Sequence, residues 1–236
     1  MMASQDFSLR PRKEKQREAV AIKVPVQFSL QEIKKHFDEG MQVLKEQYEV
    51  AENLLAQHKD AGCRMVWRSQ VLMAEGMLDF YIHEISKYGM FRMFTGQWEA
   101  SLRYANFMVP ISSVQQAVAA KETKDWFFKY INERFSREVY LSGDSMKDQL
   151  NMVGIAFAKV MVKAFAPAGG SEEEAVRQGS KIVRALFERR NAIAHQNDRS
   201  HESAEENEIT RDYVESYVIQ VEKLATAIYA VAAARG

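Results

Sequence analysis

The chain has 236 residues, of which 47% are hydrophobic, and its 32 basic side chains are balanced by 32 acidic ones. This composition supports a sizeable core and excludes wholesale disorder, while only 4 prolines and 11 glycines favour long helices over a turn-rich β-fold. Zero net charge excludes a generic coat for polyanions, so any nucleic-acid contact must be local. The single cysteine, Cys63, cannot form an internal disulfide, and no apolar run approaches the ~18–20 residues that span a bilayer. We therefore expect a cytoplasmic protein with no membrane contact.

Residues 1–28 are predicted to form an arm or a short extended segment. Within residues 1–26, six basic side chains outnumber three acidic ones, so this basic N-terminal arm is either a solvated tail or a segment that contacts phosphate. Residues 19–28 are partly β-branched and alternating, which is the pattern of a short extended segment packed on the domain.

From Ser29 onward, apolar residues recur at spacings of three and four, which predicts a single all-α domain over 29–236 with 91–166 as a helical insertion within it. Gly62 and Gly89 mark the expected limits of its second helix, and Gly76 inside that helix is compatible with close approach of a neighbouring helix. The expected helices cover 29–58, 64–87, 95–107, 111–121, 124–135, 146–166 as one or two helices, 171–195, and a last helix from 208 or 210 onward.

The helix expected over 64–87 is apolar nearly all round, which predicts a central position. Its polar exceptions Glu75, Asp79 and His83 share one face, and Glu84 lies about 100° away. Two interpretations remain open. The stripe is either a satisfied buried network in which His83 bonds to Asp79, or it supports a site around His195.

The strongest functional signal is the end of the helix expected over 171–195. Arg190 stands four residues after Leu186 and three before Ile193, so it lies within the apolar stripe. An arginine is almost never fully buried without a partner, so either this stripe meets another surface or Arg190 faces an anion. The polar run 196–208 that follows is a candidate lid or specificity loop, or only a mobile connection.

The sequence Arg190-Asn191-Ala192-Ile193-Ala194-His195 resembles the R-x4-H motif of the HEPN superfamily, in the form R-N-x-I-A-H. The stretch 78–85 is similar to the early-helix signature of the RiboL-PSP branch of that superfamily. The two matches cover the stretches around 62–88 and 171–235. The resemblance implies an HEPN-like helical bundle, here with additional helices and the basic arm, that commonly dimerises and brings two R-x4-H motifs together at a cleft. It also implies metal-independent endoribonuclease activity, although the family includes members without nuclease activity.

The residues fit this chemistry. Cleavage through a ribose 2′-hydroxyl needs a base, which histidine can supply near neutral pH, and a cation on the phosphate oxygens, which arginine can supply. No metal ligand set and no cofactor are expected, because one cysteine and scattered histidines give no zinc-like spacing. The candidate site residues are Arg190, His195 and Asn191 as catalytic residues, Asp79, His83 and Glu84 as supporting residues, and Arg189 and Arg199 as RNA-binding residues.

Arg190 and His195 are five residues apart, about 140° around an ideal helix. Two motifs facing each other across a homodimer would bring both groups to one spot. Without such a partner, Arg190 would pair with a carboxylate and His195 would interact with the helix dipole. We therefore expect a metal-independent endoribonuclease that acts on RNA as a homodimer, in a defence or toxin system with a possible antitoxin or regulatory partner. The alternative is a non-catalytic HEPN module that binds nucleotide, RNA or protein.

Overall fold

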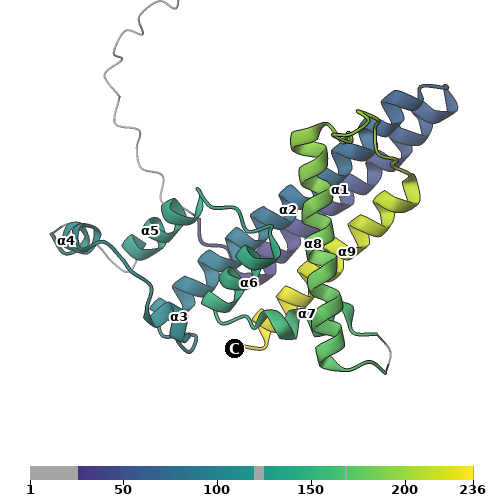
Figure 1. The fold of residues 1–236 in the computed structure, drawn as a ribbon. Helices are drawn as coiled ribbons and strands as arrows, with labels where there is room; N and C mark the ends of the chain where they lie inside the picture. Colours follow the sequence, from purple (N-terminus) through teal and green to yellow (C-terminus); the bar gives the residue numbers. More distant parts are fainter. Residues whose placement is uncertain (1–25, 120–124, 168, 236) are drawn as a thin grey trace, which may run out of the picture.

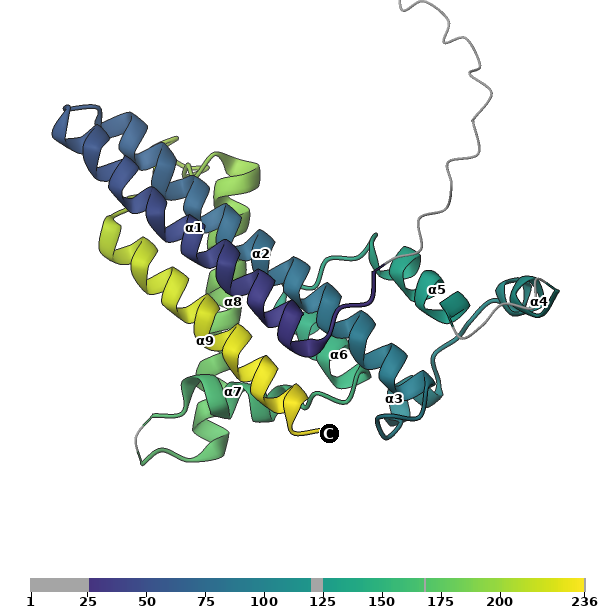
Figure 2. The ribbon, with the colours of Figure 1, turned by 180° about the vertical axis from the view of Figure 1, so that it is seen from behind.

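Two long antiparallel helices run through the molecule. The computed structural model describes residues 26–119, 125–167 and 169–235. Helices α1 (Leu30–Ala56) and α2 (Asp60–Phe94) lie side by side, and α9 (Arg211–Ala233) runs along them, as Figures 1 and 2 show from opposite sides. Helix α1 begins with a capping box: Glu32 N donates to Ser29 Oγ at 3.2 Å, and Ser29 N donates to Glu32 Oε2 at 2.7 Å.

The remaining helices pack on this layer at two places. Helix α8 (Glu172–Gln196) crosses it and contacts α2, and α7 (Phe157–Phe165) packs on both α8 and α9. Towards the other end of α2 lie α5 (Asp125–Phe135) and α6 (Gly143–Met152), with α3 (Leu102–Ala105) against α6. Helix α4 (Ile111–Ala119) projects beyond them in both views. Within the described residues every regular element is a helix, so the all-α prediction is confirmed.

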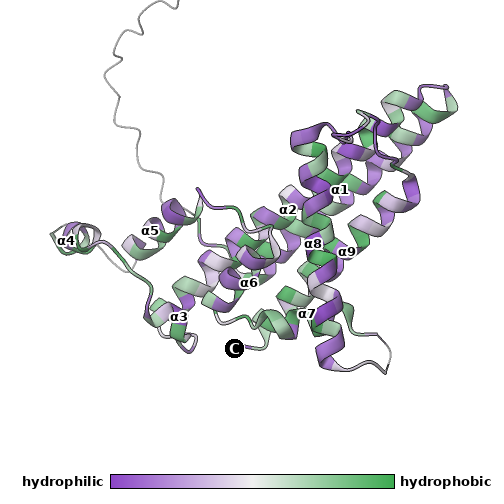
Figure 3. Cartoon of the chain, in the orientation of Figure 1, coloured by the Kyte–Doolittle hydropathy of each residue, from purple (hydrophilic) through white to green (hydrophobic). Residues whose placement is uncertain are grey.

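Helix α2 is the central helix, as its apolar pattern predicts. It packs against α1, α5, α6, α8 and α9, and its residues Leu78, Ile82 and Ile85 are at most 1% exposed. Figure 3 shows the contrast between α7, which is mostly hydrophobic, and the end of α8 with the following loop, which are mostly hydrophilic. None of the described helices combines the length and the apolar character needed to cross a bilayer.

Three glycines of α2 behave differently from the prediction. The helix begins before Gly62 and continues past Gly89 to Phe94. Gly89 allows close packing, because a Cβ there would lie 2.9 Å from Val153 Cβ and 3.0 Å from Trp98 Cζ3. Gly76 is exposed, and a Cβ there would meet no atom within 4 Å, so the predicted close approach of a neighbour at Gly76 is wrong.

The predicted helix over 95–107 is wrong except for the four residues of α3. The chain turns at Gly96, which has a φ of +75°, and the buried Trp98 then packs its ring on Tyr88. The stretch 146–166 divides into α6 and α7 at Gly154, which has a φ of +72°.

The helices predicted over 29–58, 171–195 and from 208 or 210 onward are confirmed. The basic arm lies outside the described residues except for its last three residues, 26–28, which form no strand. The status of 91–166 as an insertion stays a prediction.

Candidate functional site

Helix α8 carries the R-x4-H motif in its last two turns. Ser171 caps the helix, since Glu174 N donates to its hydroxyl at 3.1 Å, and three glutamates follow in the first turn, where the helix dipole favours negative charge. The buried stripe of α8 runs along one face and contains Ala175, Gly179, Val183, Leu186 and Ile193. The periodicity of this stripe places the motif arginine between its last two members.

The structure does not bring Arg190 and His195 together within one chain. Arg190 is half-buried, and its Nη1 donates to Asn191 Oδ1 at 2.9 Å. Because α8 continues to Gln196, both motif residues are helical and project about 140° apart. His195 is exposed, and no hydrogen bond or ion pair joins its imidazole ring to another of the described residues. One chain therefore supplies a placed arginine on one side of α8 and a free imidazole on another.

A buried carboxyl group of α2 lies beside the motif arginine. Glu75 is 2% exposed, its Oε1 is 3.0 Å from Tyr217 Oη, and its Oε2 has no hydrogen-bond partner among the described residues. Burial raises the pKa of Glu75 to about 7, against the hydrogen bond from Tyr217 and the positive charge of Arg190, which both lower it. Asp79 adds a smaller upward effect. Glu75 therefore changes its charge in the neutral range, next to the motif.

Behind the motif, a buried carboxylate binds two arginines. Asp198 is 0% exposed and accepts hydrogen bonds from Arg68 Nε at 2.8 Å, from both Nη atoms of Arg189, one of them at 2.9 Å, and from Asn207 Nδ2 at 3.0 Å. The backbone of Asp198 is left-handed, with a φ of +56°. Arg189 Nη2 also donates to the carbonyl of Glu208 at 3.0 Å. This cluster fixes the segment after α8 to both α2 and α8.

The loop over 197–209 is closed by its own hydrogen bonds. Arg199 Nη2 donates to Glu206 Oε1 at 2.8 Å, and Ser200 N donates to the carbonyl of Glu205 at 2.9 Å. The guanidinium groups of Arg189 and Arg199 are thus both paired with carboxylates within the chain. Their role in RNA binding stays a prediction, and it requires either that these pairs open or that phosphate joins them.

The supporting residues on α2 hold a different segment. Tyr140 N donates to Asp79 Oδ1 at 2.8 Å, and His83 Nε2 donates to the carbonyl of Glu138 at 3.1 Å while its ring packs on Tyr140. His83 Nε2 lies 3.8 Å from Asp79 Oδ2, which is too far for the hydrogen bond expected between these two side chains. Burial lowers the pKa of His83 more than Asp79 raises it. Both residues therefore bind the connection between α5 and α6, and their hydrogen bonds do not reach α8.

Glu84 lies on another side of α2. Its carboxylate forms an ion pair with Lys87 of the same helix, and it lines a cavity of about 300 Å³ together with Ile33 and Phe37 of α1. Glu84 therefore faces α1, in agreement with its position about 100° from His83.

Sequence reasoning omitted four residues from the site. The sequence places Glu75 in the polar stripe of the helix over 64–87, and it gives no separate signal for Tyr217. Arg68 and Asp198 were not singled out. The signal that could have found Arg68 and Glu75 is a charged residue inside an otherwise apolar helix, which needs a partner when it is buried.

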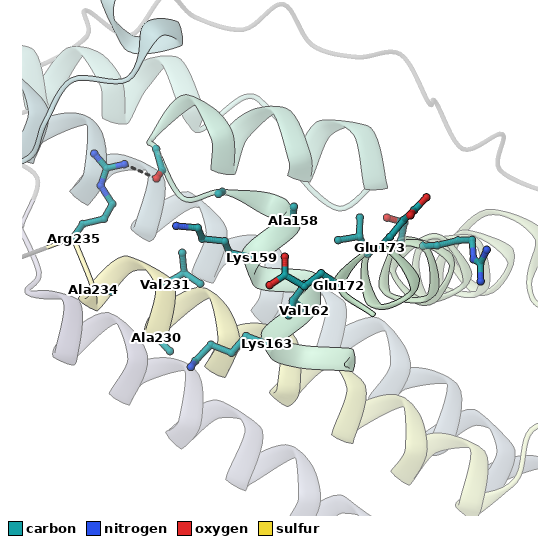
Figure 4. A pocket seen from close by; sticks show the side chains of 15 residues that line it. Ala158, Lys159, Val162, Lys163, Glu172, Glu173, Ala230, Val231, Ala234 and Arg235 are labelled. Atoms are coloured by element: carbon teal, nitrogen blue, oxygen red, sulfur yellow. Dashed lines mark hydrogen bonds between the residues drawn. The ribbon is translucent and has the colours of Figure 1, made fainter. Parts of the chain in front are cut away.

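A large cavity lies away from the motif. Its volume is about 1200 Å³, and α7, the start of α8 and the end of α9 line it, as Figure 4 shows. Lys159 and Lys163 border it beside the apolar Val162 and Val231, and Glu172 lies at its edge. Ser180 is the lining residue of α8 nearest the motif, and it lies about 15 Å along the helix from Arg190, so the cavity does not include the motif.

Comparisons of the chain with protein-family models, curated proteins and solved structures give no match. Among the described residues, no group of three or more His, Cys, Asp or Glu side chains is placed to hold a metal ion. The fold and the site define an all-helical protein with an Arg-Asn pair and an exposed histidine at the end of a helix.

Proposed function

We propose that the chain is a metal-independent endoribonuclease of the HEPN type, with a composite site formed where the α8 motifs of two copies meet. The observation that carries the proposal is the divergence of Arg190 and His195 around α8. A second copy related by a two-fold axis would present its own pair in the opposite sense, so that an arginine of one copy can lie near a histidine of the other.

In this site, His195 takes the proton of a ribose 2′-hydroxyl, and the 2′-oxygen attacks the adjacent phosphorus. The bond to the 5′-oxygen breaks, which leaves a 2′,3′-cyclic phosphate and, after protonation, a 5′-hydroxyl. Arg190 donates to the phosphate oxygens as negative charge develops there, and its hydrogen bond to Asn191 orients its guanidinium. DNA lacks the 2′-hydroxyl and would not be cleaved.

The test is cleavage of a single-stranded RNA oligonucleotide in EDTA. We expect Arg190→Ala to lower the rate by about 10²–10³-fold and His195→Ala by about 10²–10⁴-fold. Mixing the two inactive variants should restore roughly a quarter of the wild-type rate if they exchange subunits at random, because half of the dimers are mixed and each mixed dimer has one intact site. Full activity of Arg190→Ala, dependence on added metal or equal cleavage of DNA would each contradict the proposal.

A specific observation favours the alternative of a non-catalytic HEPN module that binds nucleotide, RNA or protein. Arg189 and Arg199 are neutralised by Asp198 and Glu206, so fewer free cations face a substrate than the sequence suggests. In that case RNA or a protein partner would bind without being cleaved, and sedimentation could show a monomer.

The wider setting is also a proposal. RNA and a second copy of the chain are the partners that the residues favour. A cytoplasmic location is favoured by the single cysteine, which cannot form an internal disulfide. A role in a defence or toxin system, with an antitoxin or regulatory partner, follows only from the resemblance to HEPN proteins.

A further inference from the structure

Glu75 is a buried carboxyl group for which the proposed cleavage reaction gives no role. Three ionisable groups act electrostatically on it: Arg190 from α8, Tyr217 from α9 and Asp79 from its own helix. Tyr217 Oη lies 3.0 Å from Glu75 Oε1 and 2.9 Å from the carbonyl oxygen of Leu186. Leu186 is one helical turn before Arg190, so this hydroxyl joins Glu75 to the part of α8 that carries the motif arginine.

Tyr217 has a single hydroxyl proton for its two short contacts, and this limits which charge state of Glu75 fits the arrangement. A tyrosine hydroxyl has one proton to donate, and the Leu186 carbonyl can only accept. If Glu75 is ionised, it also can only accept, so one of the two short contacts lacks a proton. If Glu75 is protonated, it donates to Tyr217, which then donates to Leu186, and both contacts are hydrogen bonds. The geometry therefore fits the neutral form of Glu75.

Arg190 is placed as this neutral form allows. It donates to Asn191 Oδ1, and no ion pair joins it to a carboxylate of the described residues. Loss of the proton would put negative charge on a group whose Oε2 is buried without a partner. An unpaired buried charge is costly, and Arg190 is the cation that acts on Glu75.

We propose that Glu75 is a positioning residue for Arg190: its ionisation draws the guanidinium from Asn191 into an ion pair with Glu75 Oε2, and its protonation releases the guanidinium. This exchange would occur near neutral pH, since burial raises the pKa of Glu75 to about 7. It needs no substrate and no second copy.

The consequence for cleavage rests on the proposed function. Ionised Glu75 would withhold Arg190 from phosphate, so the rate should fall above about pH 7, roughly tenfold for each further pH unit. The Glu75→Gln variant keeps an uncharged side chain of nearly the same shape and should lack this fall.

The first test is an NMR titration from about pH 5 to about pH 9, which spans the expected midpoint. It follows the ¹³C signal of the Glu75 carboxyl and the ¹⁵N guanidinium signals of Arg190, assigned with an Arg190→Lys variant. We expect both groups in the wild-type protein to titrate with one midpoint near 7. In Glu75→Gln, the Arg190 signals should show no inflection. A matched control is Glu222→Gln, which removes the α9 carboxylate paired with Lys45 at 2.6 Å and should preserve the inflection.

Two outcomes in the wild-type protein alone would overturn the proposal: a Glu75 midpoint near its ordinary value of 4.5, or Arg190 signals that do not follow the titration of Glu75. The second test is the pH dependence of RNA cleavage. If neither wild-type protein nor Glu75→Gln cleaves RNA while the NMR signals titrate together, the proposed nuclease fails and the control of Arg190 stands. If both cleave RNA with the same loss of rate at high pH, the nuclease stands and the role of Glu75 fails.

Discussion

Arg68 Nε donates to Asp198 Oδ2 at 2.8 Å, a contact between residues 130 positions apart that joins α2 to the segment just after α8. Asp198 is fully buried, and it also accepts from Arg189, so one carboxylate compensates two guanidinium groups. The end of the motif helix is therefore held by charge on its inner side, while His195 remains exposed on its outer side.

Replacing Asp198 with alanine should lower the free energy of unfolding by about 3–5 kcal/mol, because the largely buried Arg189 loses its counter-ion and Arg68 keeps only Glu206, at 3.3 Å. Urea unfolding measures this change, and amide hydrogen exchange should increase over 197–209. The control is Glu188→Ala, which breaks the exposed Glu188–Arg184 pair and should cost under about 1 kcal/mol. Similar losses from the two variants would show that the buried cluster contributes no more than a surface pair.

Glu75 should make stability depend on pH. Its pKa is raised from 4.5 to about 7 in the folded state, so between these values the folded state binds a proton that the unfolded state lacks. The stabilisation is complete below pH 4.5, decreases as pH rises and is lost above about 7. Relative to Glu75→Gln, the free energy of unfolding of the wild-type protein should fall by about 3 kcal/mol between pH 4.5 and about pH 7. Urea unfolding at several pH values measures this fall. A stability difference between the two proteins that is constant across this range would contradict the shifted pKa.

Two glycines of α2 should respond in opposite ways to alanine. Gly76 has open space around it, so Gly76→Ala should raise the free energy of unfolding by about 0.5–1 kcal/mol through better helix propensity. Gly89 faces Val153 and Trp98 at 3.0 Å or less, so Gly89→Ala should lower it by about 1–3 kcal/mol. Thermal unfolding of both variants provides the comparison. Equal shifts would mean that α2 does not pack closely against Trp98 and Val153 at Gly89.

Most of the fold follows from local patterns in the sequence. Apolar periodicity predicts the long helices, and the caps at Ser29 and Ser171 mark their starts, because both signals act within a few residues. Errors arise where distant contacts decide. Gly89 was predicted to end a helix, but its lack of a Cβ allows Val153, 64 residues later, to pack against α2. The stretch before α3 has helical spacing, yet the chain turns at Gly96 and Trp98 enters the core.

The candidate site also contains some residues that could be predicted from the sequence and others that could not. The place of Arg190 in the buried stripe of α8 could be predicted, because helical spacing fixes it. The pairing of Arg68 with Asp198 and of Glu75 with Tyr217 could not be predicted, because both depend on how α2 lies against α8 and α9. For Asp79 and His83, the shared face was predicted correctly, but the face meets the segment over 138–140.

The left-handed backbone of Asn197 and Asp198 has a consequence for how the chain length can vary. Two consecutive residues with φ of +51° and +56° turn the chain so that the Asp198 carboxylate enters the interior three positions after His195. An insertion or deletion within that interval would rotate the carboxylate away from Arg68 and Arg189. Residues 201–203 are exposed and lie beyond this interval, so an insertion there would leave the spacing from His195 to Asp198 unchanged.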